Sequence, residues 1–86
     1  MDMTSALRLA RATGSNDARS AFVPNEETIP TVGELCASEA AWENMEEAFP
    51  DADNIVVSAL MAAWAAAWIE TARMMEAAHP APIFEE

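Results

Sequence analysis

Carboxylates are the residues of this chain whose spacing is best suited to chemistry. Glu39, Glu43, Glu46 and Glu47 stand at i, i+4, i+7 and i+8, which places them on one side of a helix. Four residues of helix rise about 6 Å, the order of the spacing between neighbouring phosphates on one nucleic-acid strand. No lysine or arginine stands four residues away, so the carboxylates repel one another. Such a row favours electrostatic recognition of a basic surface.

Further acids lie on both sides of this row. Glu26 and Glu27 precede it, and solubility alone requires far less charge than this. We therefore prefer a binding face to an ordinary solvated face. The predicted partner-binding residues are Glu39, Glu43, Glu46, Glu47, Asp51 and Asp53.

The acidic loop before residue 54 does not predict a metal site. Asp51-x-Asp53-Asn54 is similar to the start of a calcium loop, but no glycine follows. Ala62 stands where the bidentate glutamate of such a loop belongs. These residues are better explained as helix N-caps, and we expect no metal and no cofactor.

The sequence also offers no convincing pattern of catalytic residues. Cys36 falls on an apolar helix face as a small hydrophobe, and His79 is expected to cap a helix C-terminus. With one cysteine and one histidine far apart, the chain offers neither a zinc site nor a nucleophilic pair. Gly14 and Gly33 are the only glycines, so there is no glycine-rich phosphate loop. We predict that the protein is not an enzyme.

Charge defines the class of partner. The 86 residues carry fifteen acids, four arginines and no lysine, for a formal charge of −11. Residues 23–86 hold thirteen of the acids and only one of the arginines, Arg73. This charge repels nucleic acid and anionic membranes and attracts basic proteins. Because apolar residues make up 52%, we expect residues 1–86 to fold as a single domain.

Two helices are expected to position the acidic row. Thr31-Val32-Gly33-Glu34 has the form of a capping box, and apolar residues then recur at helical spacing until Pro50, which predicts a helix over 32–48. A second helix is predicted over 54–78 from a heptad-like seam. The short loop between them favours an antiparallel αα-hairpin. The seam consists of Val57, Met61, Trp64, Trp68, Thr71, Met75 and Ala78.

The seam helix is expected to be a core helix. Its apolar run from Ile55 to Ile69 is shorter than the roughly 20 residues that a bilayer requires. Trp64 and Trp68 share one face, which we expect to belong to the core, with Trp64 packed against Leu35, Trp42 and Phe49. A dimer seam or an exposed recognition patch is the alternative.

The ends of the chain are expected to be less regular. Residues 4–12 predict a short helix that Thr13–Asp17 interrupts with turn-forming residues, followed by an irregular arm to residue 30. Residues 80–86 form a tail in which Ile83 and Phe84 could fold back onto an apolar groove. The predicted fold is therefore an all-α helical bundle: arm 1–30, hairpin 31–79 and tail 80–86.

In length, in its alanine- and glutamate-rich helices and in its lack of lysine, the chain resembles the small acidic anti-CRISPR proteins of phages and other mobile elements, several of which mimic DNA. The resemblance is compositional and carries no motif, so no residue role is transferred. It implies an inhibitor in the cytoplasm of the host bacterium, where a single cysteine fits the reducing conditions. Its target would be the basic DNA path of a CRISPR surveillance complex, in particular the PAM-reading region of a type I Cascade.

Two alternatives stay open. The seam and the alanine-rich helix also suit a homodimeric helical adaptor or structural protein whose acidity keeps it in solution. An antitoxin-like regulator of a basic protein would show the same charge. Competition with DNA for a basic nucleic-acid-binding complex, weakened by salt, distinguishes the inhibitor from the adaptor.

Overall fold

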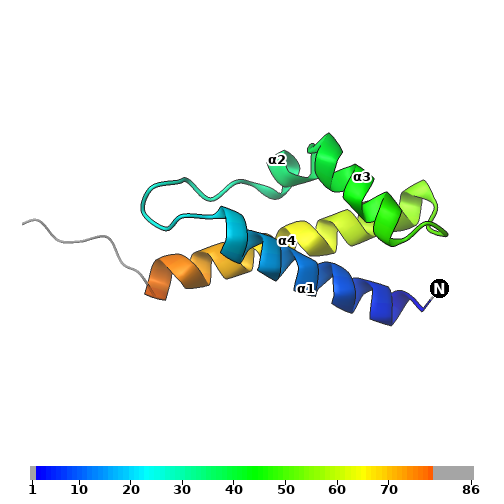
Figure 1. The fold of residues 1–86 in the computed structure, drawn as a ribbon, viewed down its shortest axis with the longest axis horizontal. Coiled ribbons are helices and arrows are strands. Elements are labelled where there is room, and N and C mark those ends of the chain that lie inside the picture. The colour runs from blue at the N-terminus through cyan, green and yellow to red at the C-terminus, as the bar shows by residue number, and fades with distance from the viewer. Residues whose placement is uncertain (1, 79–86) are drawn as a thin grey trace, which may run out of the picture.

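Four helices make up the described part of the chain, and the fold is all-α, as predicted (Figure 1). The structure is a computed structural model that describes residues 2–78, and no strand occurs in that range. The expectations for His79 and for the tail lie outside these residues. The helices are α1 (Met3–Ala21), α2 (Val32–Cys36), α3 (Glu39–Ala48) and α4 (Asn54–Ala78).

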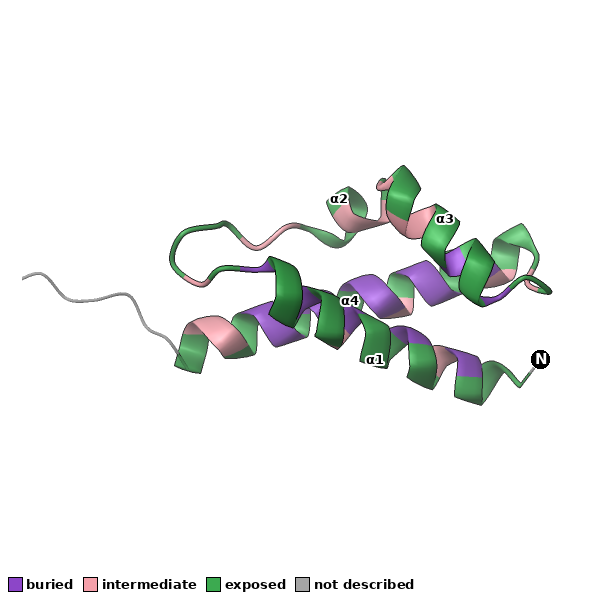
Figure 2. Cartoon of the chain, viewed as in Figure 1, coloured by how far each residue is buried: buried purple, intermediate pink, exposed green. Residues whose placement is uncertain are grey.

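The central element is α4, whose bounds match the helix predicted over 54–78. The Asp53 carboxylate caps its N-terminus by accepting the Val56 N–H at 2.9 Å. Leu60, Met61 and Val57 are almost completely buried, and Figure 2 shows the buried band that runs along α4. By length and composition α4 could cross a membrane, and 44% of its most apolar window is buried within the fold.

The N-terminal helix α1 corrects the prediction of a short helix followed by an irregular arm. It continues for 19 residues through Thr13–Asp17, where the sequence predicted a break. Packing explains the difference: Ala6, Ala10, Gly14 and Ala18 stand four residues apart, and all are buried. This stripe of small residues lets α1 lie close to α4, and the contacts outweigh the weak helix propensity of the segment.

Local bonds also stabilise the start of α1. The Asp2 carboxylate accepts the Ser5 hydroxyl at 2.6 Å and the Thr4 N–H at 3.1 Å. These two hydrogen bonds, that from the Ser5 hydroxyl first, hold the pKa of Asp2 below its usual value. The N-cap therefore favours the ionised carboxylate.

The pairing of α1 with α4 is the most extensive contact between helices. The two run in the same direction along the molecule (Figure 1). The hydroxyls of Thr71 and Ser15 are hydrogen-bonded at 2.9 Å. Phe22, just after α1, packs edge-on against Trp68 with ring centroids 5.8 Å apart. The main layer of the fold is thus a parallel α1–α4 pair, which the sequence did not predict.

The helix predicted over 32–48 is two helices. Thr31 caps α2 as expected, its hydroxyl accepting the Glu34 N–H at 3.1 Å. After Cys36 the chain leaves the helix, and the Ser38 hydroxyl caps α3 by accepting the Ala41 N–H at 3.2 Å. A serine that bonds the backbone in this way offers an alternative to a continuous helix, which explains the break.

The third helix lies over α4 on a different side from α1. It runs opposite to α4 in Figure 1 and contributes the buried Met45 and, at its C-cap, Phe49. No Cα atom of α1 comes within 8 Å of one in α3. The two helices therefore stand apart on a shared base, which creates the space described next.

Candidate functional site

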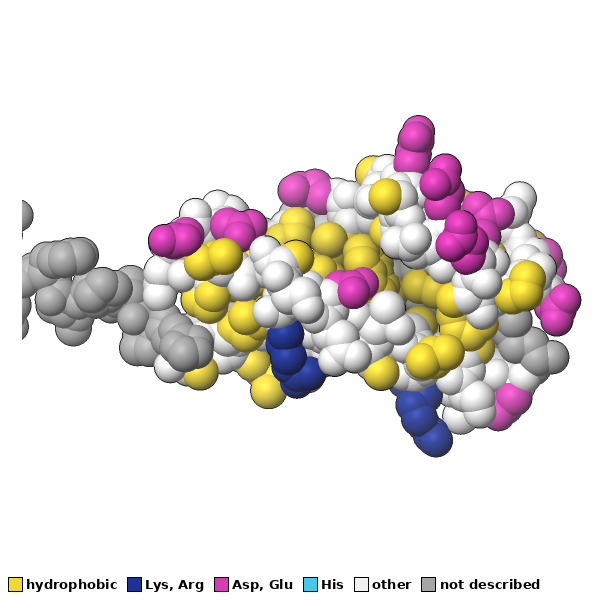
Figure 3. Space-filling view, in the orientation of Figure 1, with side chains coloured by type: hydrophobic (Ala, Val, Ile, Leu, Met, Phe, Trp, Pro, Cys, Tyr) yellow, Lys and Arg dark blue, Asp and Glu magenta, His cyan; other side chains and the backbone are white. Residues whose placement is uncertain are grey.

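The predicted acidic row lies on the outward face of α3. Glu39, Glu43, Glu46 and Glu47 are all exposed, and acidic side chains gather over α3 in Figure 3. Among residues 2–78 none of the four is paired with an arginine. Glu39 also lies in the first turn of α3, where the helix dipole favours a carboxylate.

The two predicted aspartates follow directly after α3. Asp51 and Asp53 are exposed in the loop to α4, so the structure places all six predicted residues on or beside one helix. Asp53 already accepts a backbone N–H as the cap of α4. It therefore serves the fold as well as adding charge.

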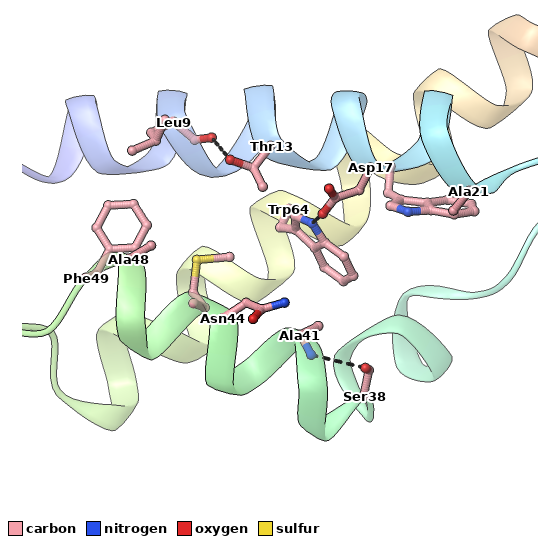
Figure 4. A pocket seen from close by; sticks show the side chains of 12 residues that line it. Leu9, Thr13, Asp17, Ala21, Ser38, Ala41, Asn44, Ala48, Phe49 and Trp64 are labelled. Carbon is pink, nitrogen blue, oxygen red and sulfur yellow. Dashed lines mark hydrogen bonds between the residues drawn. The ribbon is translucent and has the colours of Figure 1, made fainter.

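A cleft between α1 and α3 was missed by the sequence analysis. It has a volume of about 500 Å³ and is visible in Figure 3 as a hollow of apolar side chains between the two helices. Trp64 of α4 lies at its base (Figure 4), and Trp68 of the same helix also lines it. The walls consist of Leu9, Thr13, Asp17 and Ala21 from α1 and of Ser38, Ala41, Asn44, Met45, Ala48 and Phe49 from α3 and its flanking caps.

One carboxylate projects into this cleft. Asp17 is the only charged side chain among the described residues that line it, and its Oδ2 accepts the indole N–H of Trp64 at 2.8 Å (Figure 4). A hydrogen bond to an ionised acceptor is among the stronger kinds in proteins. It fixes the Trp64 ring at the base of the cleft and leaves negative charge beside an apolar surface.

The two tryptophans combine the roles that the sequence left open. Trp64 and Trp68 are 7% and 8% exposed, so both belong to the core. Leu35 and Trp42, the expected partners of Trp64, are partly buried against the same core, and Phe49 is part of it. The small remaining surface of both tryptophans lines the cleft.

A signal for the cleft was present in the sequence. Leu9, Thr13, Asp17 and Ala21 stand four residues apart, which is one face of a continuous helix. The expected break at Thr13–Asp17 concealed it. On α3 the cleft face lies opposite the glutamate row, so one helix carries both features.

Within residues 2–78, no group of three or more His, Cys, Asp or Glu side chains could hold a metal ion. Cys36 is half-buried and packs against the edge of the core. The acidic row and the cleft are the two features of the described surface from which a binding role is argued below.

Comparison with protein-family models, with curated proteins and with solved structures returned no match.

Proposed function

We propose that the protein is a non-enzymatic inhibitor that binds the basic nucleic-acid-binding surface of a partner and excludes DNA from it. The observation that carries the proposal is the unpaired row of exposed glutamates on α3. Carboxylates at helical spacing can form charge-assisted hydrogen bonds with lysine and arginine side chains that otherwise contact phosphates. The loop carboxylates Asp51 and Asp53 extend the row.

The rigidity of the support favours this role. α3 is anchored to α4 by Met45 and Phe49, so the row is held on a framework instead of a free acidic tail. A preorganised row loses less conformational entropy on binding than a flexible one. Together with the formal charge of −11, it would steer association with a basic surface.

The finer proposal concerns the target. A CRISPR surveillance complex, in particular the PAM-reading region of a type I Cascade, holds duplex DNA through positive side chains that such a row could occupy. This rests on the compositional resemblance to anti-CRISPR proteins. The same chemistry would suit any complex with a comparable basic DNA path.

Charge reversal on α3 tests the proposal. Glu43→Lys with Glu46→Lys places cations against the basic surface, where close like charges cost several kcal/mol. We expect the variant to lose its ability to prevent the target complex from binding DNA. The variant itself should stay folded, because both positions are exposed.

The matched control reverses two charges elsewhere. Glu70→Lys with Glu76→Lys changes the net charge by the same amount on α4, outside both α3 and the cleft. This variant should retain most of the inhibition. If the α3 variant inhibits as well as the wild-type protein, the proposal is wrong and the adaptor function becomes the better one.

A further inference from the structure

We infer that the cleft between α1 and α3 binds a basic amphipathic helix of the partner; this inference rests on the proposed function and names the element that docks. Each wall presents one helix face to the cleft, from Leu9 to Ala21 on α1 and from Ser38 to Phe49 along α3. Twelve residues of α1 rise about 18 Å. The cleft therefore matches about three turns of a helix.

The helices α1, α3 and α4 are arranged like a helical bundle that lacks one helix, and the cleft lies at the vacant position. α1 and α3 both pack on α4, but no Cα atom of one lies within 8 Å of a Cα atom of the other. A helix laid between them would rest on Trp64 and Trp68 and touch Leu9 and Phe49 at the sides. Leu9 is 53% exposed, so an occupant would bury apolar surface that now faces water.

Charge selects the kind of helix. Within residues 2–78, Asp17 is the only charged residue that lines the cleft, and the glutamate row lies on the opposite face of the same α3 helix. Both features are visible on the face shown in Figure 3. A helix with one apolar side and a flanking lysine or arginine could fill the cleft and pair with Asp17, while the negative charge of the whole molecule favours its approach.

Two other occupants are disfavoured by charge. A second copy of the chain would bring together two molecules of formal charge −11 each. The segment from residue 79 to residue 86 contains Glu85 and Glu86 and no lysine or arginine. That segment therefore supplies no lysine or arginine to pair with Asp17, and a second copy would add net negative charge.

The test measures binding of a synthetic helical peptide to the full chain. The probe has about fourteen residues of leucine, alanine and lysine with the leucines on one helix face, long enough for the three turns of the cleft. A scrambled peptide of the same composition controls for attraction by charge alone. Binding is followed by the change in tryptophan fluorescence and by NMR shifts of the Trp64 and Trp68 indole N–H groups.

We expect the amphipathic peptide to bind about tenfold or more tightly than the scrambled one. Leu9→Lys should weaken it by about tenfold or more, because an apolar contact is replaced by a like charge. Met74→Lys is the matched control: Met74 is 61% exposed on α4 and does not line the cleft. The affinity of the Met74→Lys variant for the peptide should stay within about twofold of the wild-type value, since the added charge is the same but lies away from the cleft.

Equal binding of the two peptides, or no indole shift at Trp64 and Trp68, would overturn the inference. Tighter peptide binding by Ile83→Ser with Phe84→Ser would assign the cleft to the chain's own C-terminal segment. Self-association that Leu9→Lys abolishes would assign it to a second copy. Loss of inhibition on α3 charge reversal without any peptide binding would leave the proposed function standing and reject only the occupant named here.

Discussion

At the scale of single residues, the contact between Asp17 and Trp64 joins stability to the cleft. The carboxylate lies on α1 and the indole on α4, 47 positions apart in the chain, yet Nε1 and Oδ2 are 2.8 Å apart. Trp64 is 7% exposed, so few other acceptors can reach its N–H. The bond therefore orients a core side chain and places a negative charge where a partner would dock.

Replacing Asp17 should separate these two effects. Asp17→Ala leaves the indole N–H without its acceptor, which costs about 1–3 kcal/mol in the free energy of unfolding. Asp17→Asn keeps an oxygen acceptor and should cost clearly less, while removing the charge that a basic helix would meet. Urea denaturation of both variants checks this. Equal stability of all three proteins would mean that the bond contributes nothing to the fold.

Trp64 itself should be essential for folding. Removing a buried ring leaves a cavity, and Trp64→Ala should lower the free energy of unfolding by about 3–5 kcal/mol. A domain of this size has little more in reserve, so circular dichroism should show a strong loss of helix on mild heating. If the variant is as stable as the wild-type protein, Trp64 belongs to an interface and not to the core.

At the scale of elements, the helix features that depend on nearby residues in the chain could be predicted from the sequence. The Asp53 cap and the long apolar seam define α4, and Thr31 defines the start of α2. The continuity of α1 could not be predicted in this way, because Gly14 and its polar neighbours have low helix propensity. Their helical state depends on α4, which begins 40 positions after Gly14.

The two binding features, the acidic row and the cleft, also differ in whether they could be predicted from the sequence. The acidic row depends on spacing within α3 and could be read from the chain, together with its exposure. The cleft depends on two helices that both pack on α4 but whose backbones stay apart, and so on tertiary contacts. Its apolar base could not be recognised while α1 was expected to end near residue 12.

A pair of glycine substitutions tests the α1–α4 packing. A Cβ at Gly14 would collide with the Trp64 carbonyl oxygen and lie 3.2 Å from the Trp68 nitrogen, both backbone atoms that cannot turn aside. Gly14→Ala should therefore destabilise the fold by about 1–3 kcal/mol despite alanine's better helix propensity.

Gly33→Ala is the matched control. A Cβ there would meet only the Thr31 Oγ1 at 3.8 Å, an ordinary contact, so alanine should be neutral or stabilising by up to about 1 kcal/mol. Thermal denaturation of the two variants compares them directly. If Gly14→Ala is as stable as Gly33→Ala, the close approach of α1 and α4 is not present in solution.

At the scale of the whole molecule, the fold carries its charge asymmetrically. The first 22 residues, mostly α1, hold three of the four arginines. The acids gather over α3 on the other side of the cleft (Figure 3). A partner that approaches this face meets an apolar cleft next to a negative surface, an arrangement suited to a basic protein.

Relieving the repulsion on α3 should stabilise the free protein. In the variant Glu43→Lys with Glu46→Lys, the cation introduced by the first substitution would lie four residues from both Glu39 and Glu47. Each new opposite-charge pair contributes about 0.2–0.5 kcal/mol. The melting temperature should therefore hold or rise as binding is lost. A lower melting temperature would show that these glutamates support the fold.

The most direct measurement is an equilibrium competition between this protein and DNA for a purified basic DNA-binding complex, a type I Cascade first, across a series of salt concentrations. We predict that the wild-type protein displaces DNA at low salt, that its affinity falls steeply toward physiological salt, and that only the α3 charge reversal, not the α4 control, abolishes displacement. Displacement that is insensitive to salt, or that survives the α3 charge reversal, would contradict recognition through the acidic row.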